Sequence, residues 1–154
     1  MAPPEISEVW SDKKQPGSES YIFVAPSPVD AYLPVSGEVS NNTGVFVKAI
    51  LANPAKSQGR IAFVKTETLT HGEIVKVWEG VTGKKAQWIP TTVESYAALW
   101  GPAGKELADQ YVWGVEYPDW GARKDVVSVD DLGIKKEDLI DLKQNLEMLK
   151  DYLI

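Results

Sequence analysis

The side chain best suited to acid–base chemistry in this sequence is the imidazole of His71, the chain's single histidine. It directly follows Thr70, where the sequence predicts the first turn of a helix. The positive end of a helix lowers the pKa of an imidazole, which favours a neutral acid or base. The alternative is an ordinary surface histidine in that turn. A Ser-His-Asp triad would have to use His71, but no nucleophile-elbow sequence accompanies it.

Carboxylates beside aromatic residues are the second class of candidates. Asp30, Glu116 and Asp119 each lie near loops and next to Tyr or Trp. Apolar surroundings raise the pKa of a carboxyl group, so such a residue can serve as an acid or base. A surface or capping carboxylate is the alternative for each. The predicted catalytic candidates are Asp30, His71 and Glu116.

Aromatic residues supply the predicted walls of a binding site. The chain has six Trp and six Tyr, residue types that serve cores, interfaces and apolar ligand pockets alike. Trp113 points away from the apolar stripe of its predicted helix, toward Asp109 and Glu116. The predicted substrate-binding residues are Trp10, Tyr21, Phe23, Tyr32, Trp113, Tyr117 and Trp120.

Composition excludes several classes of function. The chain has no Cys and one His, so a zinc site would need carboxylates for nearly all its ligands. The net charge of −6 argues against nucleic-acid partners. No apolar run is long enough to cross a membrane and no secretory signal is apparent, which favours a cytoplasmic protein without membrane partners. No glycine-rich phosphate loop occurs, and no Tyr is followed four residues later by Lys.

The stretch from Gly59 to Pro90 carries the clearest structural pattern. It predicts a buried strand at 61–64, a helix, a glycine stop and a second strand at 86–89. Thr70 and Glu73 have the spacing of a capping box, and Gly83 is expected to end the helix in a left-handed conformation. These elements predict a scaffold around which the candidate residues are placed.

Further helices are predicted on both sides of this stretch. One covers 43–52, with Asn41-Asn42-Thr43 as its cap; the same tripeptide matches an N-glycosylation pattern. Another begins with the capping spacing of Thr91 and Glu94 and is broken at Gly101-Pro102. The last covers 136–152, where a leucine seam favours packing against the chain's own core or, alternatively, a homodimer. The prediction is one α+β domain, 1–154, of five or six helices and a few short strands.

Several of these segments resemble the C-terminal half of the NmrA-like family, relatives of the extended short-chain dehydrogenases that are common among fungi. The similar segments are Asn42–Val47, Ala49–Pro54, Thr68–Glu73, Val81–Ala86, Leu99–Gly101 and Asp131–Ile134. The resemblance covers about Val35 to the C-terminus, so residues 37–154 are expected to form the NmrA-like region and 1–36 an irregular segment that lines a pocket. It implies a substrate-binding half without the N-terminal Rossmann domain that binds NAD(P).

The absence of a dinucleotide domain, which this resemblance implies, directs the functional prediction. We expect no cofactor and no NAD(P) redox chemistry. The first hypothesis is a cofactor-independent cyclase or isomerase of natural-product metabolism, for example a [4+2] pericyclase, which folds an apolar small molecule into a reactive shape. The second is a non-catalytic NmrA-like protein that binds regulators. A homodimer through the C-terminal helix or the exposed cleft face is the expected protein contact.

Overall fold

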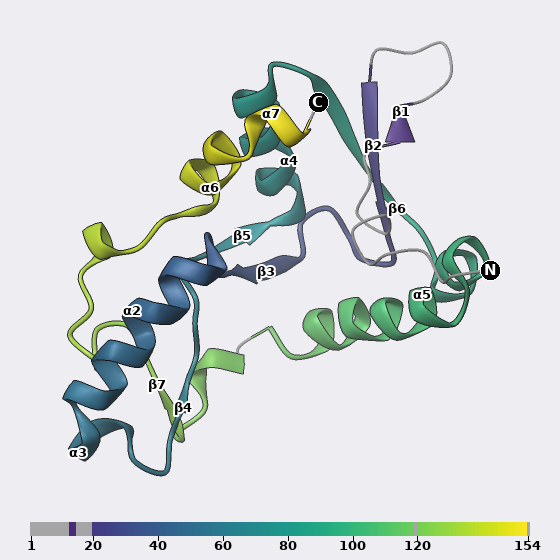
Figure 1. The fold of residues 1–154 in the computed structure, drawn as a ribbon. Coiled ribbons are helices and arrows are strands. Elements are labelled where there is room, and N and C mark those ends of the chain that lie inside the picture. Colours follow the sequence, from purple (N-terminus) through teal and green to yellow (C-terminus); the bar gives the residue numbers. More distant parts are fainter. Residues whose placement is uncertain (1–12, 15–19, 119, 154) are drawn as a thin grey trace. The chain divides into compact units, whose positions relative to one another are not determined.

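The computed structural model describes residues 13–14, 20–118 and 120–153 of the 154-residue chain (Figure 1). These residues form an α+β fold of helices with short strands, which confirms the predicted class. Contacts divide the chain into two compact units. Unit 1 comprises Met1–Tyr32 and Thr70–Pro118, and unit 2 comprises Leu33–Leu69 and Asp119–Ile154. The single domain 1–154 stays a prediction.

Unit 1 is built on a three-stranded sheet of order β1-β2-β6. The strands are β1 (Lys13–Lys14), β2 (Ser20–Ala25) and β6 (Lys85–Pro90). β1 is antiparallel to β2, whereas β2 and β6 are parallel, from Ser20 opposite Lys85 to Ala25 opposite Pro90. The carboxyl ends of β2 and β6 therefore lie at the same edge of the sheet.

Helix α4 (His71–Thr82) has both ends that the sequence predicts. Thr70 Oγ1 accepts a hydrogen bond from the Glu73 amide at 3.1 Å, and the Glu73 carboxylate accepts one from the Thr70 amide at 2.7 Å. Gly83 follows with φ of 71°, a left-handed conformation that glycine adopts without strain. The capping box fixes His71 as the first residue of the helix.

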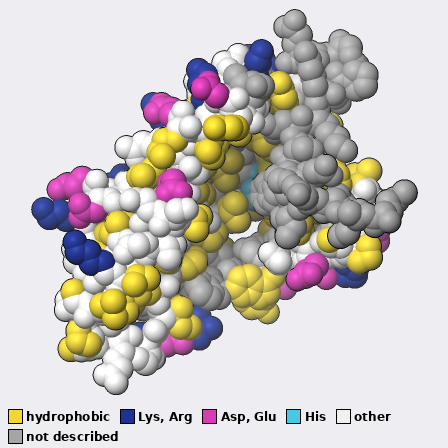
Figure 2. All heavy atoms as spheres, viewed as in Figure 1, with side chains coloured by type: hydrophobic (Ala, Val, Ile, Leu, Met, Phe, Trp, Pro, Cys, Tyr) yellow, Lys and Arg dark blue, Asp and Glu magenta, His cyan; other side chains and the backbone are white. Residues whose placement is uncertain are grey.

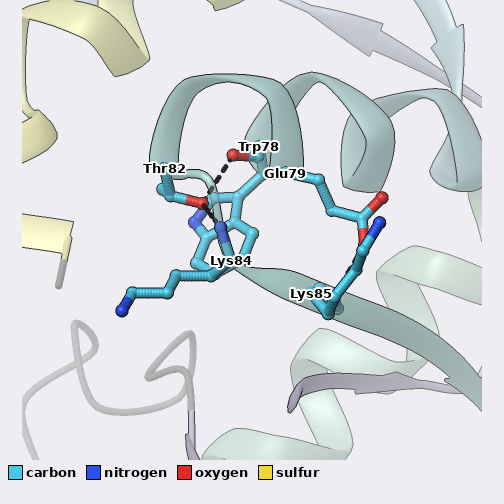
Figure 3. Close-up of polar contacts among 6 residues, drawn as sticks. Trp78, Glu79, Thr82, Lys84 and Lys85 are labelled. Carbon is cyan, nitrogen blue, oxygen red and sulfur yellow. Dashed lines mark hydrogen bonds and ion pairs between the residues drawn. The ribbon is translucent and has the colours of Figure 1, made fainter. Parts of the chain in front are cut away.

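Side chains near the end of α4 hold the chain as it turns into β6 (Figure 3). The Thr82 hydroxyl donates to the Trp78 carbonyl at 2.8 Å, and the Lys84 amide donates to Thr82 Oγ1 at 3.2 Å. Glu79 Oε1 accepts the Ala86 amide at 2.9 Å and lies 4.0 Å from Lys85 Nζ. These contacts join the helix to the strand within a few residues.

Helix α5 (Val93–Glu116) covers the same unit and is kinked as predicted. Gly101, with φ of 69° and ψ of −155°, interrupts the helical backbone just before Pro102. The helix begins one residue later than predicted, because Thr92, not Thr91, accepts the Ser95 amide at 3.1 Å. Its buried Tyr96 and Ala108 pack with Ala25 as a core cluster.

Unit 2 contains two short strand pairs and four α-helices in its described part. Strand β3 pairs with β5, and β4 runs parallel to β7 with Ile61 opposite Val126. Its core is formed by Phe46, Val127, Leu132, Ile134 and Leu139. The elements are β3 (Tyr32–Val35), α2 (Val39–Ala52), α3 (Pro54–Ser57), β4 (Ile61–Ala62), β5 (Glu67–Thr70), η1 (Trp120–Ala122), β7 (Val126–Val127), η2 (Lys136–Asp138), α6 (Leu142–Met148) and α7 (Lys150–Leu153). Tyr32 and Thr70 are the ends of β3 and β5 that belong to unit 1.

The predicted cap at Asn41-Asn42-Thr43 is wrong, because α2 begins earlier and Glu38 is its N-cap. Asn42 lies inside the helix and is fully buried. Its side-chain amide donates to Ser36 O at 2.7 Å and Ile140 O at 2.8 Å, while its Oδ1 accepts the Ile140 amide at 2.9 Å. Asn42 is thus an internal link between distant segments of unit 2, since it satisfies backbone groups that lie outside any helix or strand.

The predicted helix 136–152 is also wrong, since the segment consists of η2, an extended stretch, α6 and α7. Leu139 is extended, with φ of −109° and ψ of 142°, and is buried in the core of unit 2. Asp141 caps α6 by accepting the Gln144 amide at 2.8 Å, and the Leu142 amide donates to Glu67 Oε1 at 2.8 Å. Because of these local and long-range hydrogen bonds, the leucines of the predicted seam do not lie on one continuous helix. The predicted strand 61–64 is likewise shorter, and only β4 forms.

Hydrophobic side chains remain at the surface of unit 2. Val47 and Leu51 on α2 are 48% and 76% exposed, and Figure 2 shows yellow apolar atoms where α2 and α3 lie in Figure 1. Over the described ranges, no helix combines the length and the apolar character needed to cross a membrane.

Candidate functional site

His71 is buried in unit 1, with 3% of its surface exposed. Its imidazole Nε2 lies 2.9 Å from the hydroxyl of Ser27, which is equally buried. Which of the two atoms donates the hydrogen depends on the imidazole tautomer. Figure 2 shows only a small cyan area, the exposed remainder of this one histidine. The surface position that the sequence left open as an alternative is therefore wrong.

Aromatic rings enclose the imidazole. The Trp88 ring stacks on His71 with centroids 4.1 Å apart and planes inclined by 6°. The Trp88 indole N–H also donates to the backbone carbonyl of Ser27 at 2.9 Å. The Tyr111 ring, from α5, lies 5.8 Å from the imidazole. Four residues, Ser27, His71, Trp88 and Tyr111, thus form one contiguous cluster, here called the His71 cluster.

The loop that carries Ser27 is tied to the start of α4. We call residues 26–31 the strap. The amides of His71 and Gly72 donate to the carbonyls of Ala31 at 3.2 Å and Val29 at 2.8 Å. A Cβ on Gly72 would lie 3.2 Å from a Val29 methyl, so glycine permits this close approach. The strap satisfies helix amides that otherwise have no partner within the helix.

The electrostatic effect of this enclosure is to keep the cluster uncharged. Burial lowers the pKa of His71 to about 4, because the charged imidazolium loses its hydration. Burial also raises the pKa of the Tyr111 phenol, with a smaller contribution from nearby Tyr96. At neutral pH the cluster therefore contains a neutral imidazole and a protonated phenol.

The two predicted catalytic carboxylates occupy different surroundings from His71. Asp30 lies on the strap and Glu116 at the last position of α5, and both side chains are exposed. Their proposed acid–base roles stay predictions. His71 is the only one of the three candidates that is enclosed by other side chains.

The predicted lining residues separate into distinct groups. Tyr21 and Phe23 contact Trp78, with ring centroids 5.0 Å and 5.6 Å apart. Trp113 on α5 and Tyr117, directly after the helix, form an exposed pair, with ring centroids 5.5 Å apart and planes inclined by 32°. Tyr32 is exposed. Trp10 lies outside the described residues, and only the backbone of Trp120, in η1, is described.

Sequence reasoning missed Ser27, Trp88 and Tyr111 as neighbours of His71. Ser27 stands between Pro26 and Pro28, Trp88 lies in the predicted strand at 86–89, and Tyr111 lies in the predicted helix that carries Trp113. A usable signal was present in the strands. Ser27 is the second residue after β2, and Trp88 is near the end of β6. Ligands of open α/β sheets bind outside the carboxyl ends of parallel strands.

Possible metal and dinucleotide sites were tested against the residues present. Within the described part of the chain, no group of three or more His, Cys, Asp or Glu is placed to hold a metal ion. A dinucleotide pyrophosphate needs free amides at a glycine-rich helix start. The start of α4 does not fit this group, because its first two amides already bind the strap and no G-x-G-x-x-G occurs in the sequence.

The comparison with protein families decides the relationship of this chain. The NmrA-like family model matches residues 5–127, well over half of the 154 residues. The chain belongs to the NmrA-like family. The matched range of this NmrA-like protein contains all four residues of the His71 cluster and begins earlier than the segments on which the resemblance rested. The comparison with curated proteins gives no significant match.

Proposed function

We propose that this NmrA-like protein is a non-redox enzyme, a cyclase or isomerase of natural-product metabolism that acts on an apolar small molecule. The observation that carries the proposal is the buried pair of Ser27 Oγ and His71 Nε2, 2.9 Å apart, with the His71 ring stacked on Trp88. A hydrogen-bonded histidine among aromatic rings combines one polar group with an apolar wall. Ligand sites typically have this composition.

In the proposed reaction, the neutral imidazole donates a hydrogen bond to a carbonyl oxygen of the substrate. With a pKa of about 4, His71 carries no charge at neutral pH and is a weak base. A neutral histidine at a helix start can polarise a carbonyl group without giving up its proton. The Ser27 hydroxyl donates to Nε2, so that the imidazole proton resides on Nδ1 and is directed to the substrate. The hydrogen bond strengthens as negative charge develops on the carbonyl oxygen.

Shape supplies the remaining part of the proposed catalysis. A cyclisation or double-bond shift of an apolar chain is accelerated when the reacting atoms are held close together. The Trp88 and Tyr111 rings, at the edge where β2 and β6 end, would form the apolar wall for this step. The substrate enters when residues 29–31 of the strap move away from α4, a motion that breaks the two backbone hydrogen bonds of His71 and Gly72 and leaves Ser27 in place.

The proposal is tested by incubating the purified protein, without any nucleotide, with the metabolites that accumulate when its gene is deleted. A cyclase or isomerase converts one compound into another of unchanged mass. Liquid chromatography with mass spectrometry detects the product at a new retention time and the same mass. A redox reaction would change the mass by two hydrogens. We expect a mass-neutral conversion with the wild type and about a hundredfold slower conversion with His71→Gln.

The matched control is Glu106→Gln, which introduces the same residue type at an exposed position of α5. It should convert the compound as fast as the wild type. Conversion that requires NAD(P), or His71→Gln turnover equal to that of the control, would refute the proposal.

A second candidate function is non-catalytic binding of a regulatory protein. The observation in its favour is the pair of Trp113 and Tyr117, which are 47% and 56% exposed although both are large aromatic residues. Under this alternative, the double variant Trp113→Ala, Tyr117→Ala abolishes complex formation or self-association in sedimentation velocity, whereas His71→Gln does not. Loss of substrate conversion in His71→Gln, with unchanged conversion in the double variant, favours the enzyme.

A further inference from the structure

Trp88 contacts both members of the Ser27–His71 pair through different parts of one side chain. The indole ring stacks on the imidazole at 4.1 Å, and the indole N–H donates to the Ser27 carbonyl at 2.9 Å. Together with the bond between Ser27 Oγ and His71 Nε2, these contacts close a triangle of three residues. The three residues come from the strap, the start of α4 and β6.

Trp88 stands on the most regular of the three elements. It lies inside β6, opposite Phe23 of β2, and the residues before and after it in β6 also pair with β2. Ser27, by contrast, lies on a loop between two prolines. A group on a paired strand has less freedom than one on a loop, so the Trp88 indole can hold Ser27 in place beside His71.

We infer that Trp88 is a positioning residue that holds His71 in one ring orientation and one tautomer. The stacked ring fixes the plane of the imidazole, and the indole N–H fixes the Ser27 backbone and thereby its hydroxyl opposite Nε2. With Ser27 donating to Nε2, the imidazole proton is held on Nδ1. This role rests on the proposed function, because a fixed Nδ1–H is what polarises the substrate.

A purely structural role for Trp88 predicts something different. A large ring that only fills space would be replaced by Phe at a cost in stability, with no change in the imidazole tautomer. The positioning role predicts that Trp88→Phe, which keeps a stacking face and removes the N–H donor, allows a mixture of tautomers.

Nitrogen-15 NMR of histidine-labelled protein at pH 7 tests the inference, since the chain has a single histidine. In the wild type we expect the two well-separated resonances of the neutral Nδ1–H tautomer, with Nε2 unprotonated, and ring protons shifted upfield by the stacked indole; the Nε2–H tautomer would overturn the inference. Ser27→Ala and Trp88→Phe should each move the two nitrogen resonances toward one another. The matched control Trp100→Phe, which makes the same change in a residue that contacts Tyr96, should leave them unchanged.

The result that overturns the inference is an unchanged tautomer in Trp88→Phe and Ser27→Ala. Should both variants fail to fold, a wild-type spectrum with mixed tautomers or without the upfield shift overturns it as well. None of these spectra requires a substrate, so failure of the proposed function is recognised separately, as absence of conversion by a wild type whose tautomer is fixed. With a substrate in hand, Trp88→Phe should lower kcat about tenfold with little change in KM.

Discussion

At the scale of single residues, the central feature is a histidine whose hydrogen-bond partner is 44 positions away in sequence. Thr70 and Glu73 determine where His71 stands, and both are readable from the sequence as a capping box. The burial of His71 cannot be predicted from its own segment, because Ser27 and Trp88 come from the region where β2 and β6 pair. Sequence reasoning therefore identified the candidate imidazole but missed the residues around it.

The buried imidazole predicts a specific dependence of stability on pH. The pKa of His71 is about 4 when folded and 6.5 when unfolded, so the unfolded chain binds more protons between these values. The free energy of unfolding contributed by His71 is thus complete above pH 6.5 and decreases by up to about 3 kcal/mol as pH falls to 4. Urea unfolding at several pH values measures this change. The His71→Gln variant should lack it, and an equal pH dependence in both proteins would contradict burial of the imidazole.

Gly37 supports a second prediction at this scale. It adopts φ of 59°, and a Cβ there would overlap the carbonyl oxygen of Ile140. Gly37→Ala should therefore lower the free energy of unfolding by several kcal/mol. Gly44→Ala is the matched control, because Gly44 lies within α2 and a Cβ there meets no other atom. The control should stabilise the protein by about 1 kcal/mol. Equal effects of the two substitutions in urea unfolding would contradict the close contact with Ile140.

At the scale of elements, a helix end is predicted correctly from the sequence when the hydrogen bonds that define it lie within the same segment. Helix α4 begins and ends as predicted, since its capping box and its left-handed glycine lie within the segment itself. The predicted final helix is instead interrupted, because Leu139 is drawn into the core and the Leu142 amide binds Glu67. Asn42 departs from its predicted capping role for the same reason, through bonds to Ile140.

The capping box of α4 gives a prediction for an element. Thr70→Ala removes the hydroxyl that accepts the Glu73 amide at 3.1 Å, and should lower the free energy of unfolding by about 1 kcal/mol. Thr68→Ala, an exposed position of the preceding strand, is the control and should have a smaller effect. Both are measured by urea unfolding at pH 7. A Thr70→Ala protein as stable as the wild type would show that the cap contributes nothing.

At the scale of the whole molecule, each unit is assembled from two segments of the chain. Unit 1 needs Met1–Tyr32 and Thr70–Pro118, and unit 2 needs Leu33–Leu69 and Asp119–Ile154. Neither unit can therefore be completed by a single continuous stretch. The sequence contained no sign of this division, because the prolines and glycines around it resemble those of any loop.

This interleaving predicts that the chain unfolds in one cooperative transition, as the predicted single domain requires. Five of the six Trp belong to unit 1 by position, so fluorescence reports mainly on unit 1. Far-ultraviolet circular dichroism reports on the helices of both units. The two urea transitions should coincide, and a separation between their midpoints would show that the units unfold independently.

The most direct test of the proposed chemistry remains conversion without a nucleotide. The purified wild-type protein is mixed with the metabolites of a strain that lacks its gene, beside His71→Gln and the Glu106→Gln control. Our account predicts a product of unchanged mass that forms with the wild type and the control and about a hundredfold more slowly with His71→Gln. Equal product formation by all three proteins, or none without NAD(P), would contradict it.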